Sequence, residues 1–322
     1  MTLSGARAGE SARAPRPVAR RGLGRALTGA ALSAPPVLVI LLFVGLPMVA
    51  AVLYTLGLTG GLNSTIAAIA QHQHVSRNGA PTLAAWHEVL TDPQFLASLW
   101  ATVYVTVLST AITIALAWFL ALYLRFHDNW VSRAVSALSV VPMFIPAVIG
   151  AYAVLTFWAP NGFFRTMATQ LGWSHAPTFG YTLGGVIIGS VWSNLPFAVL
   201  MIVSGLQGVP AGLIDAARDV DAGPVRRFWT VLLPLTSVPT IIATTFTAIG
   251  ILGSFTLPYI VGPTGGNILG PVMSNSYTAF NTPQQAQVMA VVVFVLAALA
   301  GIPYVWANFR SGRNTATPRG GR

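Results

Sequence analysis

Six long apolar runs separated by shorter polar segments make up most of the chain. They cover approximately residues 34–58, 97–124, 134–158, 183–207, 235–260 and 286–309. An α-helix rises 1.5 Å per residue, so about 20 apolar residues cross the roughly 30 Å of hydrocarbon in a bilayer. Each run is long enough to do so. The pattern predicts an all-α, polytopic membrane protein with six transmembrane helices.

The first apolar run is predicted to be a retained helix. Six arginines precede it, as in a secretory signal peptide. However, it is longer than a signal-peptide core, which has roughly 7–15 residues. No small-residue cleavage site is evident after Leu58.

The composition supports the membrane interpretation. Hydrophobic residues make up 54% of the chain and charged residues 7%. In an ordinary soluble domain about a quarter of the residues are charged. The sequence contains no lysine, which excludes a P-loop lysine and a lysine Schiff base on this chain. It also contains no cysteine, which excludes disulfides, thiol nucleophiles and cysteine-ligated metals.

The arginines predict the orientation. Fifteen of the 17 cationic residues precede the first run, follow the last, or lie between runs two and three or four and five. Only Arg77 and Arg165 lie on the other side. By the positive-inside rule both termini are cytoplasmic. Orientation also explains the net charge of +10 better than nucleic-acid binding does. We expect disordered cytoplasmic tails at 1–30 and 311–322, flanking a permease domain at 31–310.

One cytoplasmic connection, residues 208–234, is unusually charged, and we call it the charged segment. Pro210 lies near the start of a predicted short helix that contains "GLIDAAR". The sequence "VDAGP" follows, where Gly223 and Pro224 would end that helix and begin another. The second helix runs to Pro234. The segment is too polar to insert in the bilayer, and small residues beside directional charges are typical of a docking element.

This segment resembles the cytoplasmic loop signature of permease subunits of binding-protein-dependent ABC importers. The signature runs Glu-Ala-Ala, three residues, Gly-Ala, a hydrophobic residue, then Leu-Pro. Asp215, where the family has Glu, and Asp221, where it has Gly, depart from it. Asp tolerates left-handed backbone better than most residues, so the turn is expected to survive. The residues assigned to ATPase docking are Asp215, Ala216, Ala217, Asp221, Ala222, Gly223, Phe228 and Pro234.

The resemblance implies a type I ABC importer permease fold in the bacterial inner membrane. It also implies ABC ATPase subunits, a second permease subunit that forms a heterodimer with this chain, and an extracytoplasmic solute-binding protein. This chain would bind no cofactor itself, because ATP and Mg would be held by the partner subunits. The alternative is an ordinary cytosolic loop with positive-inside charge. That interpretation does not account for the match along the whole signature, from Asp215-Ala216-Ala217 to Leu233-Pro234.

Prolines and polar residues interrupt apolar runs three to five. Broken helices are tolerated in membranes where protein or a water-filled cavity satisfies the freed backbone groups, and transport sites use such places. Helix–helix packing by small and polar residues is the alternative for each residue. The residues assigned to the substrate path are Tyr152, Trp192, Asn194, Ser254, Thr256 and Tyr259.

Three other features are interpreted as structural. His72 and His74 lack a nearby cysteine or acid, so a solvated loop is favoured over a metal site. Glu88 and Asp92 are outer-loop acids on which nothing else is expected to converge. The "GPTGGN" sequence at 262–267 lacks a lysine and is interpreted as a turn. Between 59 and 96 we expect a short surface helix, with Trp86 and Trp100 at the membrane interface.

These features favour a permease that imports a small hydrophilic solute by alternating access, and they indicate no catalytic residues. An ion-coupled secondary transporter would be expected to carry intramembrane charges, which the six runs lack. A non-transporting scaffold would need neither the broken helices nor the signature. The absence of buried carboxylates favours a neutral sugar or polyol, whereas "GSFTLPYIVG" resembles the polyamine-type branch.

Overall fold

The computed structural model describes residues 21–58, 68–76, 78–264 and 267–315. It divides into two units, Met1–Ala51 and Val52–Arg322. Among the described residues, five helices are long and apolar enough to cross a membrane, or six when one bent pair counts as a single span. Described secondary structure is helical throughout, which agrees with the all-α prediction.

The first span is a nearly continuous helix. It comprises α1 (Arg21–Ile40), a π-helical turn η1 (Leu41–Gly45) and α2 (Leu46–Thr55). Helix already begins at Arg21, within the segment that we assigned to the N-terminal tail. At the other end of the chain, helix extends to Thr315, into the segment assigned to the C-terminal tail.

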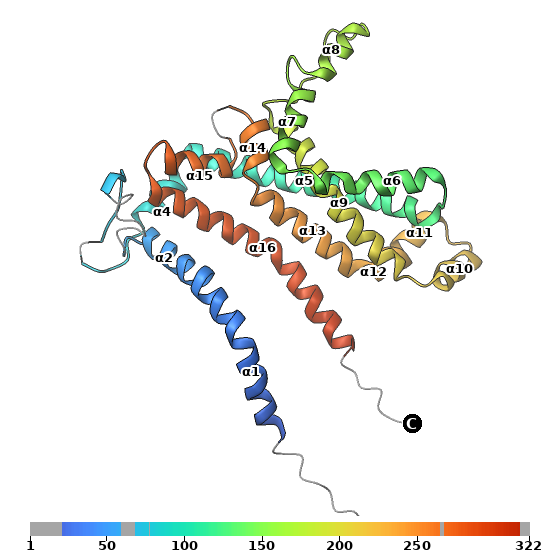
Figure 1. Cartoon of the computed structure of the whole chain (residues 1–322), viewed down its shortest axis with the longest axis horizontal. Helices are drawn as coiled ribbons and strands as arrows, with labels where there is room; N and C mark the ends of the chain where they lie inside the picture. Colours follow the sequence, from blue (N-terminus) through green and yellow to red (C-terminus); the bar gives the residue numbers. More distant parts are fainter. Residues whose placement is uncertain (1–20, 59–67, 77, 265–266, 316–322) are drawn as a thin grey trace, which may run out of the picture. The chain divides into compact units, whose positions relative to one another are not determined.

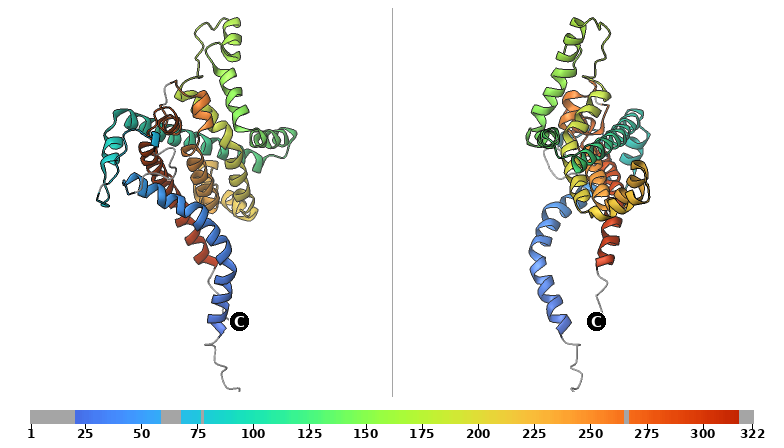
Figure 2. Two further views of the ribbon diagram at one scale, coloured as in Figure 1. Left: turned by 60° about the vertical axis from the view of Figure 1, so that its left-hand side comes forward. Right: turned by 90° about the vertical axis from the view of Figure 1, so that its right-hand side faces the viewer.

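Four helices form the centre of the second unit. They are α5 (Pro93–Phe126), α9 (Leu183–Gln207), α13 (Ser237–Leu252) and α16 (Pro283–Thr315). α5 packs along α9, and α13 contacts α5, α9 and α16 (Figures 1 and 2). Three clusters of buried apolar side chains follow one another through this bundle.

Small and hydroxyl-bearing residues bring α5 and α9 together. The buried residues of α5 include Ser98, Thr102, Ser109, Thr113 and Ala117, and those of α9 include glycine, serine and alanine. Without a hydrophobic driving force between helices in lipid, short side chains allow the close approach that dispersion requires.

The predicted third span is broken. In place of one helix over 134–158, the structure has α6 (Trp130–Val140), a 3-10 turn η2 (Val141–Phe144) and α7 (Ala147–Trp158). Pro142 and Pro146 lie at the break, where their rings and missing N–H groups prevent a continuous helix. The third long apolar stretch is therefore Ala147–Gln170, which includes α8 (Phe163–Gln170).

The predicted fifth span is bent at one end and interrupted at the other. Residues Pro224–Leu235 join α13 at an angle of 78°. α13 ends at Leu252, and α14 (Thr256–Val261) follows after a short non-helical stretch. The apolar run 235–260 is thus two helices.

Short helices cover the two ends of the bundle. α4 (Ala84–Thr91) and α15 (Leu269–Thr278) pack with the starts of α5 and α16. At the opposite end lie α10 (Ala211–Asp219), α11 (Pro224–Arg227), the π-helical turn η3 (Phe228–Leu232) and α12 (Leu233–Leu235), as Figure 1 shows. The charged segment is therefore separated from α4 and α15 by the length of the bundle.

Candidate functional site

The first half of the charged segment is a helix with a complete C-terminal cap. α10 ends in a turn in which the Ala222 N–H donates to the Ala217 carbonyl at 3.1 Å and the Asp221 N–H to the Arg218 carbonyl at 2.9 Å. These two bonds form a Schellman motif, whose residue after the cap takes a left-handed conformation. Asp221 has φ +50°, so it occupies the position that usually belongs to glycine.

The second half restarts immediately. Gly223 has an extended conformation, with φ −58° and ψ 164°, and Pro224 occupies the first helical position. Proline suits that position because its N–H would lack a partner there in any case. The helix–turn–helix predicted from "VDAGP" is confirmed, with Asp221 rather than Gly223 providing the left-handed residue.

The predicted docking residues divide into two groups. Asp215, Ala216, Asp221, Gly223 and Pro234 are exposed, and Ala217 is half-buried. Ala222 is buried, and Phe228 is half-buried with its ring edge-on to Trp118 of α5 at a centroid distance of 5.0 Å. Ala222 and Phe228 therefore attach the charged segment to the bundle and are less available on its outer surface.

Further contacts fix the charged segment to the bundle. The Arg125 guanidinium donates to the Val209 carbonyl at 3.3 Å, and Ile214 and Leu232 are buried in the same core cluster as Trp118. Asp215 pairs with Arg218 at 3.1 Å on the surface, where such a pair contributes little. The sequence analysis did not identify the exposed apolar side chains of the charged segment, Val220, Val225 and Trp229. Their position close to charged residues in the sequence was the available signal.

A cavity of about 560 Å³ lies where the broken helices meet. η2, α9, α13 and the start of α14 supply its walls. Four of the six residues predicted for the substrate path line it, namely Trp192, Asn194, Ser254 and Thr256. Pro142, Phe197, Phe246 and Gly250, which were not assigned to the path, also line it.

Tyr152 and Tyr259, the other two predicted path residues, do not line this cavity. Both side chains are exposed, and Tyr259 stacks on Phe255 at 5.1 Å. Sequence alone could not separate them from the lining residues, because the rotation of α7 and α14 determines which side chains point inward.

Asn194 is the most polar side chain of the cavity wall. Its amide nitrogen donates to the Ser190 carbonyl at 2.8 Å and to the Ser193 hydroxyl at 3.2 Å. The amide oxygen faces Gly250, where an added Cβ would lie 3.3 Å away. The nitrogen is thus held by the helix, and the oxygen remains available to accept a hydrogen bond.

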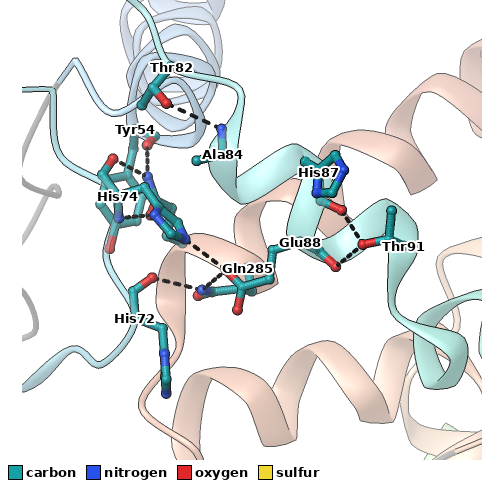
Figure 3. Close-up of polar contacts among 10 residues, drawn as sticks. Tyr54, His72, His74, Thr82, Ala84, His87, Glu88, Thr91 and Gln285 are labelled. Atoms are coloured by element: carbon teal, nitrogen blue, oxygen red, sulfur yellow. Dashed lines mark hydrogen bonds and ion pairs between the residues drawn. The ribbon is translucent and has the colours of Figure 1, made fainter.

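A cluster of polar side chains lies near α4 and the start of α16, at the end of the bundle away from the charged segment (Figure 3). The His74 ring lies 2.9 Å from the Glu88 carboxylate, and the Gln285 amide donates to the same carboxylate oxygen at 3.2 Å. Gln284 binds the backbone on both sides, accepting from the His74 N–H and donating to the Tyr54 carbonyl. The residues 71–74 are therefore clamped to α4 and α16, and our expectation that nothing converges on Glu88 was wrong.

Two opposing effects set the acidity of Glu88. Burial raises the pKa of its carboxyl, but hydrogen bonds from His74 and Gln285, together with the nearby His72, outweigh burial and hold the pKa below its usual value.

Trp86 belongs to this end as well, since its indole donates to the Thr55 hydroxyl at 3.2 Å. It is thus half-buried inside the protein, whereas Trp100 is exposed.

Some sequence expectations fall outside the described residues. They are the tails at 1–20 and 316–322, Arg77, and positions 265 and 266 of the "GPTGGN" sequence. Within the described part of the chain, no group of three or more His, Asp or Glu side chains could hold a metal ion.

Curated relatives are membrane components of transport systems. The chain is 32% identical to the probable ABC transporter permease protein y4oQ of Sinorhizobium fredii, over 59% of this chain and 62% of that protein. It is 31% identical to the sn-glycerol-3-phosphate transport system permease protein UgpA of Yersinia pestis, over 48% and 53%. It is 28% identical to the spermidine/putrescine permease PotB of Haemophilus influenzae, over 53% and 60%. The matches thus span between half and two thirds of the length of these relatives.

Solved structures share the fold. A bacterial ABC transporter involved in the import of the acidic polysaccharide alginate matches with a TM-score of 0.68 at 16% identity, over 92% of this chain and 98% of that one. The same kind of transporter in complex with an alginate pentasaccharide-bound periplasmic protein matches with a TM-score of 0.69 at 17% identity, over 92% and 97%.

The family model of the binding-protein-dependent transport system inner membrane component matches residues 113–311, which include the charged segment and all the residues that line the 560 Å³ cavity. This match covers more than half of the chain, and the fold shared with the solved transporters agrees with it. The chain therefore belongs to the inner membrane components of binding-protein-dependent transport systems, the permease family that its charged segment resembles.

Proposed function

We propose that this chain is the permease subunit of an ABC importer and that it moves a small hydrophilic solute across the inner membrane by alternating access. ATP hydrolysis would take place on partner ATPase subunits, which hold the nucleotide and Mg. The other partners are a second, different permease subunit and an external solute-binding protein. Both termini and the charged segment face the cytoplasm.

The observation that carries this proposal is the continuity between the charged segment and the cavity. The exposed helix–turn–helix continues through η3 and α12 into α13 across the 78° bend. Phe246 and Gly250 of α13 line the cavity. A force applied to the exposed residues around Ala216 is thus transmitted along one stretch of backbone to the cavity wall.

The proposed mechanism follows from this connection. Closure of the ATPase subunits would push α10, while Phe228 against Trp118 and Arg125 against Val209 keep the segment attached to α5. α13 would then shift relative to α9, and the cavity between them would open toward one side or the other. Interfaces packed this tightly switch between discrete arrangements rather than deform continuously.

The cavity wall supports a neutral solute. None of its lining residues is charged, and the lining residues with polar side-chain groups are Trp192, Ser193, Asn194, Ser254 and Thr256. A buried polyamine would lack a counter-charge there, which is costly, whereas hydroxyl and amide groups suit a sugar or polyol. Uptake competition by unlabelled polyols and by polyamines tests this choice, and competition by polyamines alone would overturn it.

Substitutions in α10 test the coupling role. Asp215→Lys with Ala217→Trp places a reversed charge at an exposed position and a bulky ring at a half-buried one on the docking helix. We expect the chain to insert normally, but its affinity for the ATPase subunits to fall at least about tenfold, a loss of about 1.4 kcal/mol. The ATPase subunits should then be lost on co-purification, and uptake should fall with them. Asp215→Glu, which keeps the charge, is the matched control and should retain both the ATPase subunits and uptake. Unchanged uptake and unchanged co-purification in the double variant would reject the proposal.

A further inference from the structure

A second cavity lies beneath the charged segment, at the end of α5. Its volume is about 350 Å³. Leu122 and Phe126 of α5 and Val231 of η3 supply apolar walls, and the side chains of Arg218, Arg227 and His127 supply polar ones. An apolar cleft with two guanidinium groups is suited to a ligand that has both an anionic group and hydrocarbon.

Arg227 lacks a counter-charge in the part of the chain that the structure describes. No hydrogen bond or ion pair joins its half-buried guanidinium to another described residue, and its Nε is buried without an acceptor. Arg218, by contrast, pairs with Asp215. Leaving a buried cationic donor unpaired costs free energy, so an anion from outside the chain would stabilise this arrangement.

Two exposed tryptophans near this cavity indicate its level relative to the lipid headgroups. Trp130 follows shortly after the end of α5 and is 78% exposed, and Trp229, beside Phe228, is 62% exposed. Tryptophan is enriched where the bilayer meets water, at the level of the lipid headgroups. Basic pockets between membrane helices on the cytoplasmic side are suited to phosphate headgroups. The cavity therefore lies where a phospholipid of the inner leaflet could enter.

We infer that this cavity binds the phosphate headgroup of an anionic phospholipid, with Arg227 as its main donor. Leu122, Phe126 and Val231 would contact the glycerol and the first carbons of the acyl chains. The inference rests on the proposed function, because that function places the charged segment at the inner leaflet. A carboxylate of an ATPase subunit is the less favoured occupant, because the exposed residues Asp215, Ala216 and Asp221 do not line the cavity.

Lipid titration of the purified, delipidated full-length chain tests this site. The unfolding temperature is followed while phosphatidylglycerol, phosphatidylcholine or inorganic phosphate is added. We expect phosphatidylglycerol to act at a lower concentration than phosphatidylcholine, and Arg227→Gln to weaken its effect about tenfold, as for the loss of a hydrogen bond to a charged group. Arg226→Gln is the matched control, since it removes the same charge from an exposed neighbour that does not line the cavity.

A second variant keeps the test independent of charge. Val231→Trp fills the cavity without changing any ionisable group, and it should weaken phosphatidylglycerol binding as Arg227→Gln does. Equal effects of the two lipids, or equal behaviour of the Arg226 and Arg227 variants, would overturn the inference. An Arg227-dependent response to inorganic phosphate as large as that to phosphatidylglycerol would overturn the lipid as the source of the anion.

Co-purification separates this inference from the proposed function. Arg227→Gln should retain the ATPase subunits, whereas Asp215→Lys with Ala217→Trp should lose them and still prefer phosphatidylglycerol. Loss of the ATPase subunits from Arg227→Gln would assign Arg227 to the subunit interface instead. If the double variant retains its ATPase subunits while the lipid preference depends on Arg227, only the coupling role fails.

Discussion

At the scale of single residues, Asp221 shows how the family turn tolerates the loss of its usual glycine. Its φ is positive. Such a conformation costs an ordinary L-residue roughly 1–2 kcal/mol, and less for Asp or Asn. The Schellman bonds of α10 impose that conformation in spite of its cost. The departure from the family signature therefore leaves the turn intact but strained.

We expect Asp221→Gly to stabilise the chain by about 0.5–1 kcal/mol, because glycine adopts this φ without penalty. The measurement is the thermal unfolding temperature in detergent. Gly223→Ala is the matched control, because Gly223 has φ −58° and no atom lies within 4 Å of an added Cβ. Alanine restricts the unfolded chain but is a poorer N-cap than glycine for α11, so little net change is expected. An unfolding temperature for Asp221→Gly at or below that of the wild type would contradict this account.

Glu88 predicts how stability depends on pH. Its folded pKa lies below the ordinary value of 4.5, since the contacts with His74 and Gln285 outweigh burial. The stabilisation is fully present above the unfolded pKa and is lost as the pH falls through the folded pKa. We expect the unfolding temperature to fall below about pH 4.5, and Glu88→Gln to flatten that fall.

Asp128→Asn is the control for this pH dependence, because Asp128 is exposed and its contact with Arg133 is 3.6 Å long on the surface. It should leave the acid-induced loss as large as in the wild type. Equal slopes for the wild type and Glu88→Gln would show that Glu88 does not stabilise this end of the bundle.

At the scale of elements, glycine determines how closely α7 approaches α9. A Cβ added at Gly150 would lie 2.6 Å from the ring of Trp192, which lines the 560 Å³ cavity. The contact between the two helices and the position of a cavity residue thus depend on the same missing side chain.

We expect Gly150→Ala to destabilise the chain by about 1–3 kcal/mol through overpacking and to reduce uptake by displacing Trp192. Gly301→Ala is the matched control. Gly301 is also within a helix, but an added Cβ there meets nothing within 4 Å. A gain of about 0.5–1 kcal/mol is therefore expected from the better helix former. Unfolding temperature and uptake are measured on both variants, and equal behaviour would exclude packing against Trp192 as the cause.

At the scale of the whole molecule, the absence of cysteine allows the orientation to be tested directly. Ala216→Cys and Leu171→Cys each introduce one thiol at an exposed position, in α10 and after α8. With a membrane-impermeant maleimide on intact spheroplasts, we expect Leu171→Cys to react and Ala216→Cys to react only after permeabilisation. The reverse pattern would place the charged segment outside and reject the importer.

The sequence alone determined the features that depend on local chemistry. Apolar runs of sufficient length predicted the spans, because each backbone group in lipid must be satisfied within its own helix. Prolines marked the break in the third span and the restart of the helix at Pro224 in the charged segment, because the ring fixes φ and the missing N–H acts wherever proline occurs.

Only the tertiary structure decided which side chains converge. It placed Trp192 and Asn194 in one cavity with Ser254 and Thr256, left Tyr152 and Tyr259 outside, and turned Phe228 toward Trp118. It also clamped His74 to Glu88 across separate elements. The physical reason is that a membrane helix is apolar on nearly every side, so its apolar pattern does not mark the face that packs inward. Packing against its neighbours fixes that rotation, and with it the site.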